Sequence, residues 1–151
     1  MSKKTNSIKA LLFLLILSSQ NLYTQQNPVT WNIEFNDFNI EFNAVIEKDW
    51  HLYAVYMPSP NDGPLPTIFE YDFSTDYSLD DSTIQKEPIT HFDADFGVEV
   101  SYYEDQAFFK QQIDIIKKSS FTINGAISYM CCNNETCIPL EKEFSVVINQ
   151  D

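Results

Sequence analysis

The chain has 151 residues and a formal net charge of −13, because 22 acidic side chains oppose nine lysines and no arginine. This length is typical of one domain rather than of a multi-domain enzyme. Nucleic-acid binding and charge-driven attachment to anionic lipid both need a dense basic face. The composition therefore excludes both of these function classes.

The N-terminus has the layout of a secretory signal peptide. Three lysines precede an apolar run of eight residues at positions 10–17, and no acidic residue occurs before Glu34. The run is too short to span a bilayer, and the order of the segments is that of an exported chain. We expect a cleaved signal peptide over residues 1–22 and one mature domain over residues 23–151, without a membrane span. The mature chain would keep six lysines and 22 acidic residues, which gives a charge of −16.

Apolar residues alternate with polar ones over most of the remaining chain, as they do in half-buried strands. Turn signals, of which the longest is the proline-rich loop 58–66, separate these segments at fairly regular spacing. The pattern predicts an all-β fold, an immunoglobulin-like antiparallel β-sandwich. The expected strands cover residues 31–35, 38–46, 50–57, 67–73, 77–79, 98–103, 107–116, 121–130 and 144–148, with an irregular acidic segment over 80–97.

The expected strand 121–130 contains Asn124-Gly125, a dipeptide that often forms a hairpin turn. Apolar residues at positions 121, 123, 127 and 129 nevertheless stay in phase on both sides of it. A turn at this dipeptide would break that phase, so we expect one continuous strand.

Three cysteines, Cys131, Cys132 and Cys137, lie within seven residues near the C-terminus. An exported compartment is oxidising, so a pair of cysteines there normally forms a disulfide. A disulfide across so short a loop removes little chain entropy, and a domain of about 130 residues buries enough surface to be stable without one. The cluster therefore suits redox exchange better than covalent stapling.

Strand alternation predicts which face of the sheet each of the three cysteines is on. The apolar residues before them are odd-numbered, which directs Cys131 toward the core and Cys132 toward the opposite face. In the last expected strand the apolar residues are even-numbered, and the same alternation extended backwards directs Cys137 outward. Cys132 and Cys137 would then share the outer side of a hairpin with loop 133–136, unless Pro139 or a bulge resets the phase.

Three stretches of the chain, residues 129–139, 49–53 and 93–97, resemble parts of one known family, the N-terminal periplasmic domain of the DsbD thiol:disulfide interchange proteins. The most specific stretch, residues 129–139, is similar to the family's aromatic residue, two cysteines four or five residues apart, and following proline. Residues 49–53 resemble the strand beside the family's redox site, and residues 93–97 resemble its acidic cap loop. The resemblance covers essentially the whole mature chain and implies an immunoglobulin-like sandwich in the bacterial periplasm.

The resemblance also implies a role for each matching residue. Cys137 would form the mixed disulfide with partner proteins, and Cys132 would be its intramolecular mate. Phe96, flanked by Asp95, would cap the cysteine pair. His51 and Tyr53 would line the site.

Two departures from the family pattern concern the pairing and the partners. A spacing of five residues would select Cys131 instead of Cys132, whereas the alternation and the four-residue spacing favour Cys132, so the pairing stays open. The family continues into a multi-helix membrane domain and a thioredoxin-like domain. The resemblance therefore implies that this chain meets a membrane electron transporter and thioredoxin-like periplasmic proteins as separate polypeptides, or that it has lost the relay role.

The predicted function is a periplasmic thiol:disulfide exchange domain that relays reducing equivalents between a membrane electron transporter and periplasmic thiol proteins. The competing hypothesis is a noncatalytic immunoglobulin-like binding module with a structural hairpin disulfide. Whether the chain is an enzyme, as a protein-disulfide reductase component, stays open. We expect no cofactor and no metal site, because the three sulfurs lack the spaced ligand pairs of closed metal sites.

Overall fold

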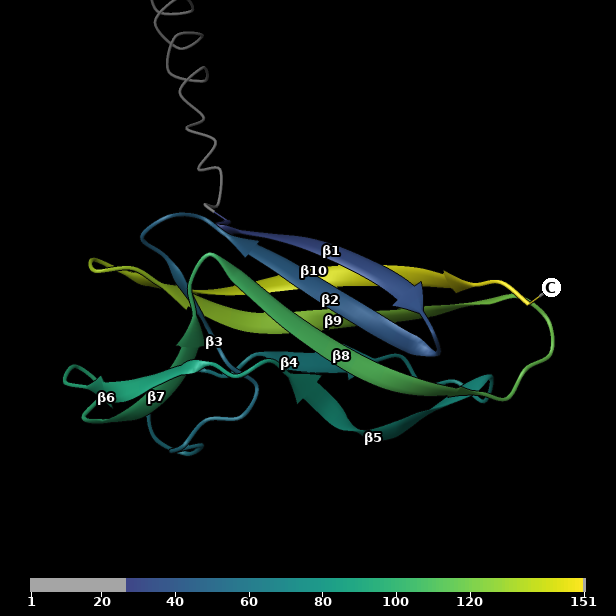
Figure 1. Cartoon of the computed structure of the whole chain (residues 1–151), viewed down its shortest axis with the longest axis horizontal. Coiled ribbons are helices and arrows are strands. Elements are labelled where there is room, and N and C mark those ends of the chain that lie inside the picture. Colours follow the sequence, from purple (N-terminus) through teal and green to yellow (C-terminus); the bar gives the residue numbers. More distant parts are fainter. Residues whose placement is uncertain (1–26, 151) are drawn as a thin grey trace, which may run out of the picture.

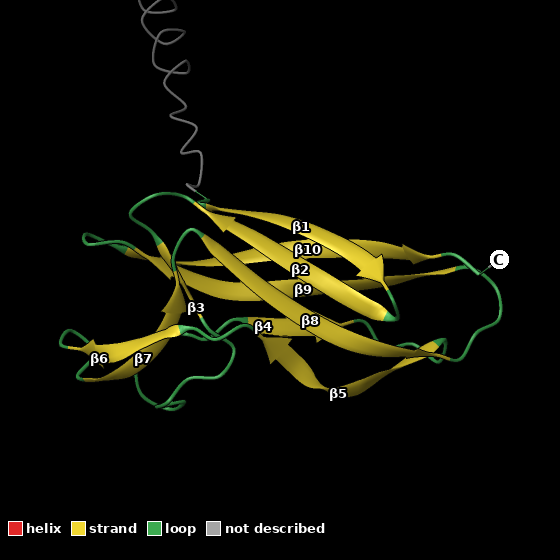
Figure 2. Ribbon diagram, viewed as in Figure 1, coloured by secondary structure: helices red, strands yellow, loops and turns green. Residues whose placement is uncertain are grey.

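The computed structural model describes residues 27–150, which form two antiparallel β-sheets packed face to face (Figure 1). This part of the chain consists of strands and loops (Figure 2), and no helix in it is long and apolar enough to cross a membrane. The fold is the immunoglobulin-like antiparallel β-sandwich that the alternation predicts. The signal peptide expected over residues 1–22 lies outside the described residues.

The described strands follow the order β1 to β10 along the chain. One sheet has the strand order β1-β2-β8-β5, and the other has the order β10-β9-β3-β7-β6, with β4 also paired to β9. Their bounds are β1 Val29–Asn36, β2 Asn39–Ile46, β3 His51–Tyr53, β4 Ile68–Tyr71, β5 Tyr77–Gln85, β6 Ile89–Asp93, β7 Val98–Tyr103, β8 Gln106–Ile115, β9 Phe121–Cys132 and β10 Cys137–Ile148.

The prediction of an irregular acidic segment over residues 80–97 is wrong. β5 continues to Gln85 along β8, with a register shift between Asp80 and Ile84, and β6 pairs with β7. Most side chains of β6 are exposed. Its strand conformation comes from backbone pairing with β7 rather than from apolar burial, so the sequence carries no alternation that would reveal it.

Two further strand bounds differ from the prediction by more than two residues. β3 stops at Tyr53 instead of residue 57, because Oε1 of Gln85 accepts hydrogen bonds from the backbone N–H groups of Val55 and Tyr56, at 2.9 and 3.2 Å. β10 begins at Cys137 instead of residue 144, since its register with β9 is unbroken over the whole strand. This longer β9–β10 hairpin places the cysteines at its tip.

β9 runs through Asn124-Gly125 without a turn, as predicted. Gly125 pairs with Tyr71 of β4 on one side and with Phe144 of β10 on the other. A Cβ atom at this position would lie 2.2 Å from the carbonyl oxygen of Glu70 and 2.6 Å from Cζ of Phe144. The missing side chain thus allows β4 and the Phe144 ring to approach β9 closely.

A Gly125→Ala substitution is therefore expected to destabilise the domain by about 1–3 kcal/mol, because the added methyl group would overlap backbone atoms. The effect should appear as a lower urea midpoint with an unchanged slope. Asn124→Ala, at an exposed position on the same strand, is the control and should change stability by less than about 0.5 kcal/mol. Equal stability of the two variants would contradict the close approach.

The main core lies between the sheets, and a smaller cluster lies on the outer face of the second sheet. In the main core, the Phe109 ring has its centroid 5.3 Å from that of Phe69 and 5.5 Å from that of Tyr103. The smaller cluster consists of buried Tyr53, Val100 and Cys132, with Met57, Val98, Tyr102 and Met130 packed against it. This second cluster positions the candidate site.

Candidate redox site

Cys132 and Cys137 form a disulfide at the tip of the β9–β10 hairpin. They are the first directly opposed pair of the ladder, and their Cα atoms are 4.0 Å apart. In the connecting turn, Oδ1 of Asn133 accepts hydrogen bonds from the N–H groups of Glu135 and Thr136, both at 2.9 Å. The Asn133 N–H donates to the Thr136 carbonyl, also at 2.9 Å. The hairpin therefore positions both sulfurs independently of the covalent bond.

The two residues of the disulfide differ in exposure. Cys137 is exposed, whereas Cys132 is only 2% exposed and packs with Tyr53 and Val100. The alternation correctly directs Cys132 away from the main core to the outer face of the hairpin, but it does not show that the second cluster covers Cys132 there. An incoming sulfur atom therefore has direct access to Cys137 alone.

Cys131 lies on the opposite face of β9, in the main core, where it is fully buried and unpaired. Burial raises the pKa of its thiol to about 12. The thiolate is the form that attacks disulfides, so a thiol that stays protonated at neutral pH is inert. Cys131 acts here as a small apolar core residue.

His51 and Tyr53 lie next to the disulfide on β3. His51 is directly opposite Cys132 in the β3–β9 register, so Cys137, Cys132 and His51 form a row across three adjacent strands. Directly opposed residues in an antiparallel sheet have their side chains on one face, with Cβ atoms about 4.5–5.5 Å apart. Tyr53 lies on the same face, and its hydroxyl oxygen is 3.1 Å from Nε2 of His51.

Burial controls the protonation of both side chains. It lowers the pKa of His51 from 6.5, although the carboxylates of Glu104 and Asp93 partly oppose this effect. The imidazole is therefore neutral at neutral pH. Burial, with a further contribution from Asp93, raises the pKa of Tyr53 above its ordinary value, so this phenol keeps its proton.

Phe96 and Asp95 lie in the turn of the β6–β7 hairpin, at the same end of the sandwich as the cysteines (Figure 1). Oδ1 of Asp93 accepts hydrogen bonds from the N–H groups of Asp95 and Phe96, at 2.9 and 3.2 Å. Gly97 completes the turn with a φ of 72°, which favours glycine. The Phe96 ring is 38% exposed and lies edge-on to Tyr53, with centroids 6.4 Å apart. Phe96 thus contacts the site residue Tyr53, whereas the Asp95 side chain is exposed.

Tyr102 of β7 is a site residue that the sequence reasoning missed. Its ring centroid lies 4.7 Å from that of His51 and 5.2 Å from that of His91. The alternation of Val98, Val100 and Tyr102 places these three residues on one face of β7, but only the strand order shows that this face contains the disulfide. Among the described residues, no group of three or more His, Cys, Asp or Glu could hold a metal ion.

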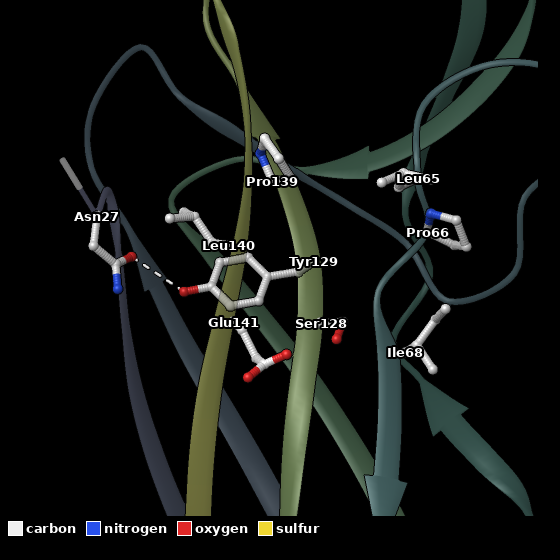
Figure 3. Close-up of a pocket in the computed structure, with 9 residues that line it drawn as sticks. All are labelled: Asn27, Leu65, Pro66, Ile68, Ser128, Tyr129, Pro139, Leu140 and Glu141. Carbon is white, nitrogen blue, oxygen red and sulfur yellow. Dashed lines mark hydrogen bonds between the residues drawn. The ribbon is translucent and has the colours of Figure 1, made fainter. Parts of the chain in front are cut away.

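An open groove with a cavity volume of about 610 Å³ lies along β9 and β10, and neither cysteine of the disulfide lines it. Figure 3 shows Leu65 and Pro66 on the segment that leads into β4, and Pro139 on β10 across from them. Pro139 follows Cys137 by two residues on the same face of its strand. Leu65 is 57% exposed. The strand that carries the exposed Cys137 therefore also contributes, two residues further on, to a partly apolar surface that is open to solvent.

The fold and the site together define a class of protein, an immunoglobulin-like sandwich with a half-exposed cysteine pair at one end. The family model described as "Thiol:disulfide interchange protein DsbD, N-terminal" matches residues 19–149, and the chain belongs to this family. No curated protein sequence matches the chain.

Two solved structures share the fold at low sequence identity. The reduced N-terminal domain of DsbD from Neisseria meningitidis has a TM-score of 0.59 and 13% identity, over 81% of this chain and 86% of that chain. The complex between the DsbD N-terminal and PilB N-terminal domains of the same organism gives a TM-score of 0.56 and 12% identity, over 83% of this chain and 87% of that chain.

Proposed function

We propose that this domain exchanges disulfides in the periplasm and relays reducing equivalents between a membrane electron transporter and periplasmic thiol proteins. The observation that supports this most directly is the unequal exposure of the Cys132–Cys137 disulfide. A disulfide that only braces a hairpin has no need of one accessible sulfur. The proposal includes export with cleavage of residues 1–22 and a mature domain over residues 23–151.

In the proposed uptake of electrons, a thiolate of the donor attacks Sγ of Cys137. The Cys132–Cys137 bond breaks, its electron pair stays on Cys132, and a mixed disulfide forms between Cys137 and the donor. A second thiolate of the donor then attacks the donor's own sulfur and releases Cys137. The domain leaves as a dithiol and the donor as a disulfide, so two electrons have moved. Delivery to an acceptor disulfide follows the reverse order.

Thioredoxin-like proteins are the proposed soluble partners. A solved relative is a complex between the DsbD N-terminal and PilB N-terminal domains, which shows that a domain of this family binds another protein domain. In this chain, the groove along β9 and β10, to which Pro139 contributes two residues after Cys137, offers partly apolar surface for such a contact. Phe96 is proposed to cap the site until a partner displaces it from Tyr53, since its ring is already partly exposed.

Equilibration of the purified protein in glutathione buffers, followed by labelling of free thiols and mass spectrometry, tests the proposal. We expect a reduction potential above about −300 mV, in the range where thioredoxin-like proteins exchange with it, and labelling of the exposed Cys137 only after reduction. A potential below about −300 mV without exchange would instead favour the binding module with a structural disulfide. Cys131 should stay unlabelled in the folded protein because it is fully buried.

A further inference from the structure

His51 is the titratable side chain directly opposite Cys132 in the sheet. Its Nε2 atom contacts the Tyr53 hydroxyl at 3.1 Å, and its ring packs against Tyr102. These two contacts hold the imidazole on the face that contains the buried sulfur. We propose that His51 accepts the proton of the Cys132 thiol when Cys132 resolves a mixed disulfide on Cys137. This inference rests on the proposed exchange function.

Cys132 needs a local base because its surroundings disfavour the thiolate. The residue is 2% exposed and packs with apolar groups, and burial penalises the charged form of a thiol. Only the thiolate attacks a disulfide. Tyr53, in the same cluster, keeps its own proton and cannot serve as the base.

The charged and titratable groups around His51 support a neutral base whose protonated form is stabilised. Burial keeps the imidazole neutral before the reaction, and carboxylates face the positive charge that it acquires during the reaction. The groups that face it are Lys48 and Asp49 from the β2–β3 connection, His91 and Asp93 from β6, Tyr102 from β7, Glu104 and Asp105 from the β7–β8 turn, Cys132 from β9, and Tyr53 from its own strand.

The hydrogen bond to Tyr53 indicates which ring nitrogen of His51 accepts the proton of Cys132. In the proposed arrangement Nε2–H donates to the Tyr53 oxygen, which leaves Nδ1 as the acceptor. Tyr53 is then a positioning residue for His51.

The proposed step balances in atoms and charge. The Cys132 proton moves to Nδ1 of His51, and the resulting thiolate attacks Sγ of Cys137. The Cys132–Cys137 bond forms, the bond between Cys137 and the partner sulfur breaks, and its electron pair leaves as the partner thiolate. The domain is oxidised and the partner reduced. The imidazolium then returns its proton to the leaving sulfur or to water.

Reaction of the reduced protein with 5,5′-dithiobis(2-nitrobenzoate) isolates this step without any partner protein. The first coloured thiolate is released when Cys137 forms the mixed disulfide, and the second is released when Cys132 resolves it. Stopped-flow absorbance between pH 5 and 8 then gives the resolution rate. In the wild type we expect this rate to rise with pH to a plateau, with a midpoint below about 6.5, because only the neutral imidazole accepts a proton.

His51→Phe keeps an aromatic ring against Tyr102 and removes the base. At pH 7 we expect its resolution rate to be about 10²-fold lower than that of the wild type. With increasing pH this rate should rise about tenfold per pH unit without a plateau, because it then follows the thiolate fraction of Cys132 alone. His91→Phe is the matched control. Its ring also contacts Tyr102, but His91 pairs with Val100 and not with a cysteine, so this variant should keep the wild-type plateau rate. Its midpoint should move slightly upward, because His91 contributes to the lowered pKa of His51.

The outcomes separate the two proposals. If the wild type and His51→Phe release the second thiolate at the same rate, exchange stands and the role of His51 is overturned. If the wild type releases only the first thiolate, the cysteine pair does not exchange and both proposals fail. The wild-type profile is a test that needs no variant, so a profile without an inflection below about pH 6.5 overturns the role of His51 even if His51→Phe does not fold.

Discussion

A Cys132→Ser variant is expected to form a stable covalent complex with a thioredoxin-like partner through Cys137. Cys137 is the exposed sulfur, so it can accept a partner thiolate without rearrangement of the fold. Without Cys132, no thiol of this chain lies opposite Cys137 to displace the partner. The complex should therefore persist, whereas the wild type should complete the exchange and release the partner. The Cys132→Ser variant should accordingly lose essentially all turnover.

The measurement uses Cys132→Ser whose Cys137 has been converted to a mixed disulfide with 5-thio-2-nitrobenzoate. It is mixed with a thioredoxin variant that keeps only its attacking cysteine, so the partner cannot reverse the bond. A one-to-one complex should appear on non-reducing gels as the coloured thiolate is released. Peptide mapping should place the new bond at Cys137.

Two matched variants test the assignment of the three sulfurs. Cys137→Ser should give no complex, because the remaining Cys132 is 2% exposed and cannot be reached by a folded partner. Cys131→Ala should exchange like the wild type, since Cys131 lies in the main core on the other face of β9. A complex trapped through Cys131 would contradict the role assigned to each sulfur.

The β-sandwich and the separation of the cysteines could be predicted from the sequence because both follow from strand alternation. β9 keeps one phase from Phe121 to Cys132, so adjacent Cys131 and Cys132 must face opposite sides. The same phase correctly shows that Asn124-Gly125 does not turn the chain. Local periodicity is sufficient wherever one face of a strand packs against the main core.

The covering of Cys132 and the position of His51 could not be predicted in the same way. Both depend on the order of strands β9, β3 and β7, which are distant in sequence and have no local signal for their pairing. The resemblance indicated that His51 lines the site, but only the register shows that it lies opposite Cys132. β6 was missed because most of its side chains are exposed.

A Phe109→Ala substitution is expected to lower the free energy of unfolding by about 3–5 kcal/mol. Phe109 is fully buried on β8, and its ring contacts three aromatic rings, those of Trp31, Phe69 and Tyr103, with centroids 5.3–6.0 Å apart. These partners lie on β1, β4 and β7, so one ring joins both sheets. Such a loss is a large part of the roughly 5–15 kcal/mol that stabilises a domain.

Thermal and urea unfolding of the oxidised protein measure this effect, with an expected fall in Tm of about 10–20 °C. Phe73→Ala is the matched control, because this ring is 96% exposed and its loss should change stability by less than about 0.5 kcal/mol. A loss below about 1 kcal/mol for Phe109→Ala would contradict its central place in the core.

The same variant tests whether the redox site depends on the core. Tyr103, which packs on Phe109, pairs with Leu52 of β3, and the next residue towards the N-terminus is His51. The disulfide itself is held by the β9–β10 ladder and the Asn133 turn. Below its unfolding transition, Phe109→Ala should therefore release the first thiolate from the dithiobis(nitrobenzoate) reagent at the wild-type rate. Any slowing should be confined to the second release, which depends on the position of β3.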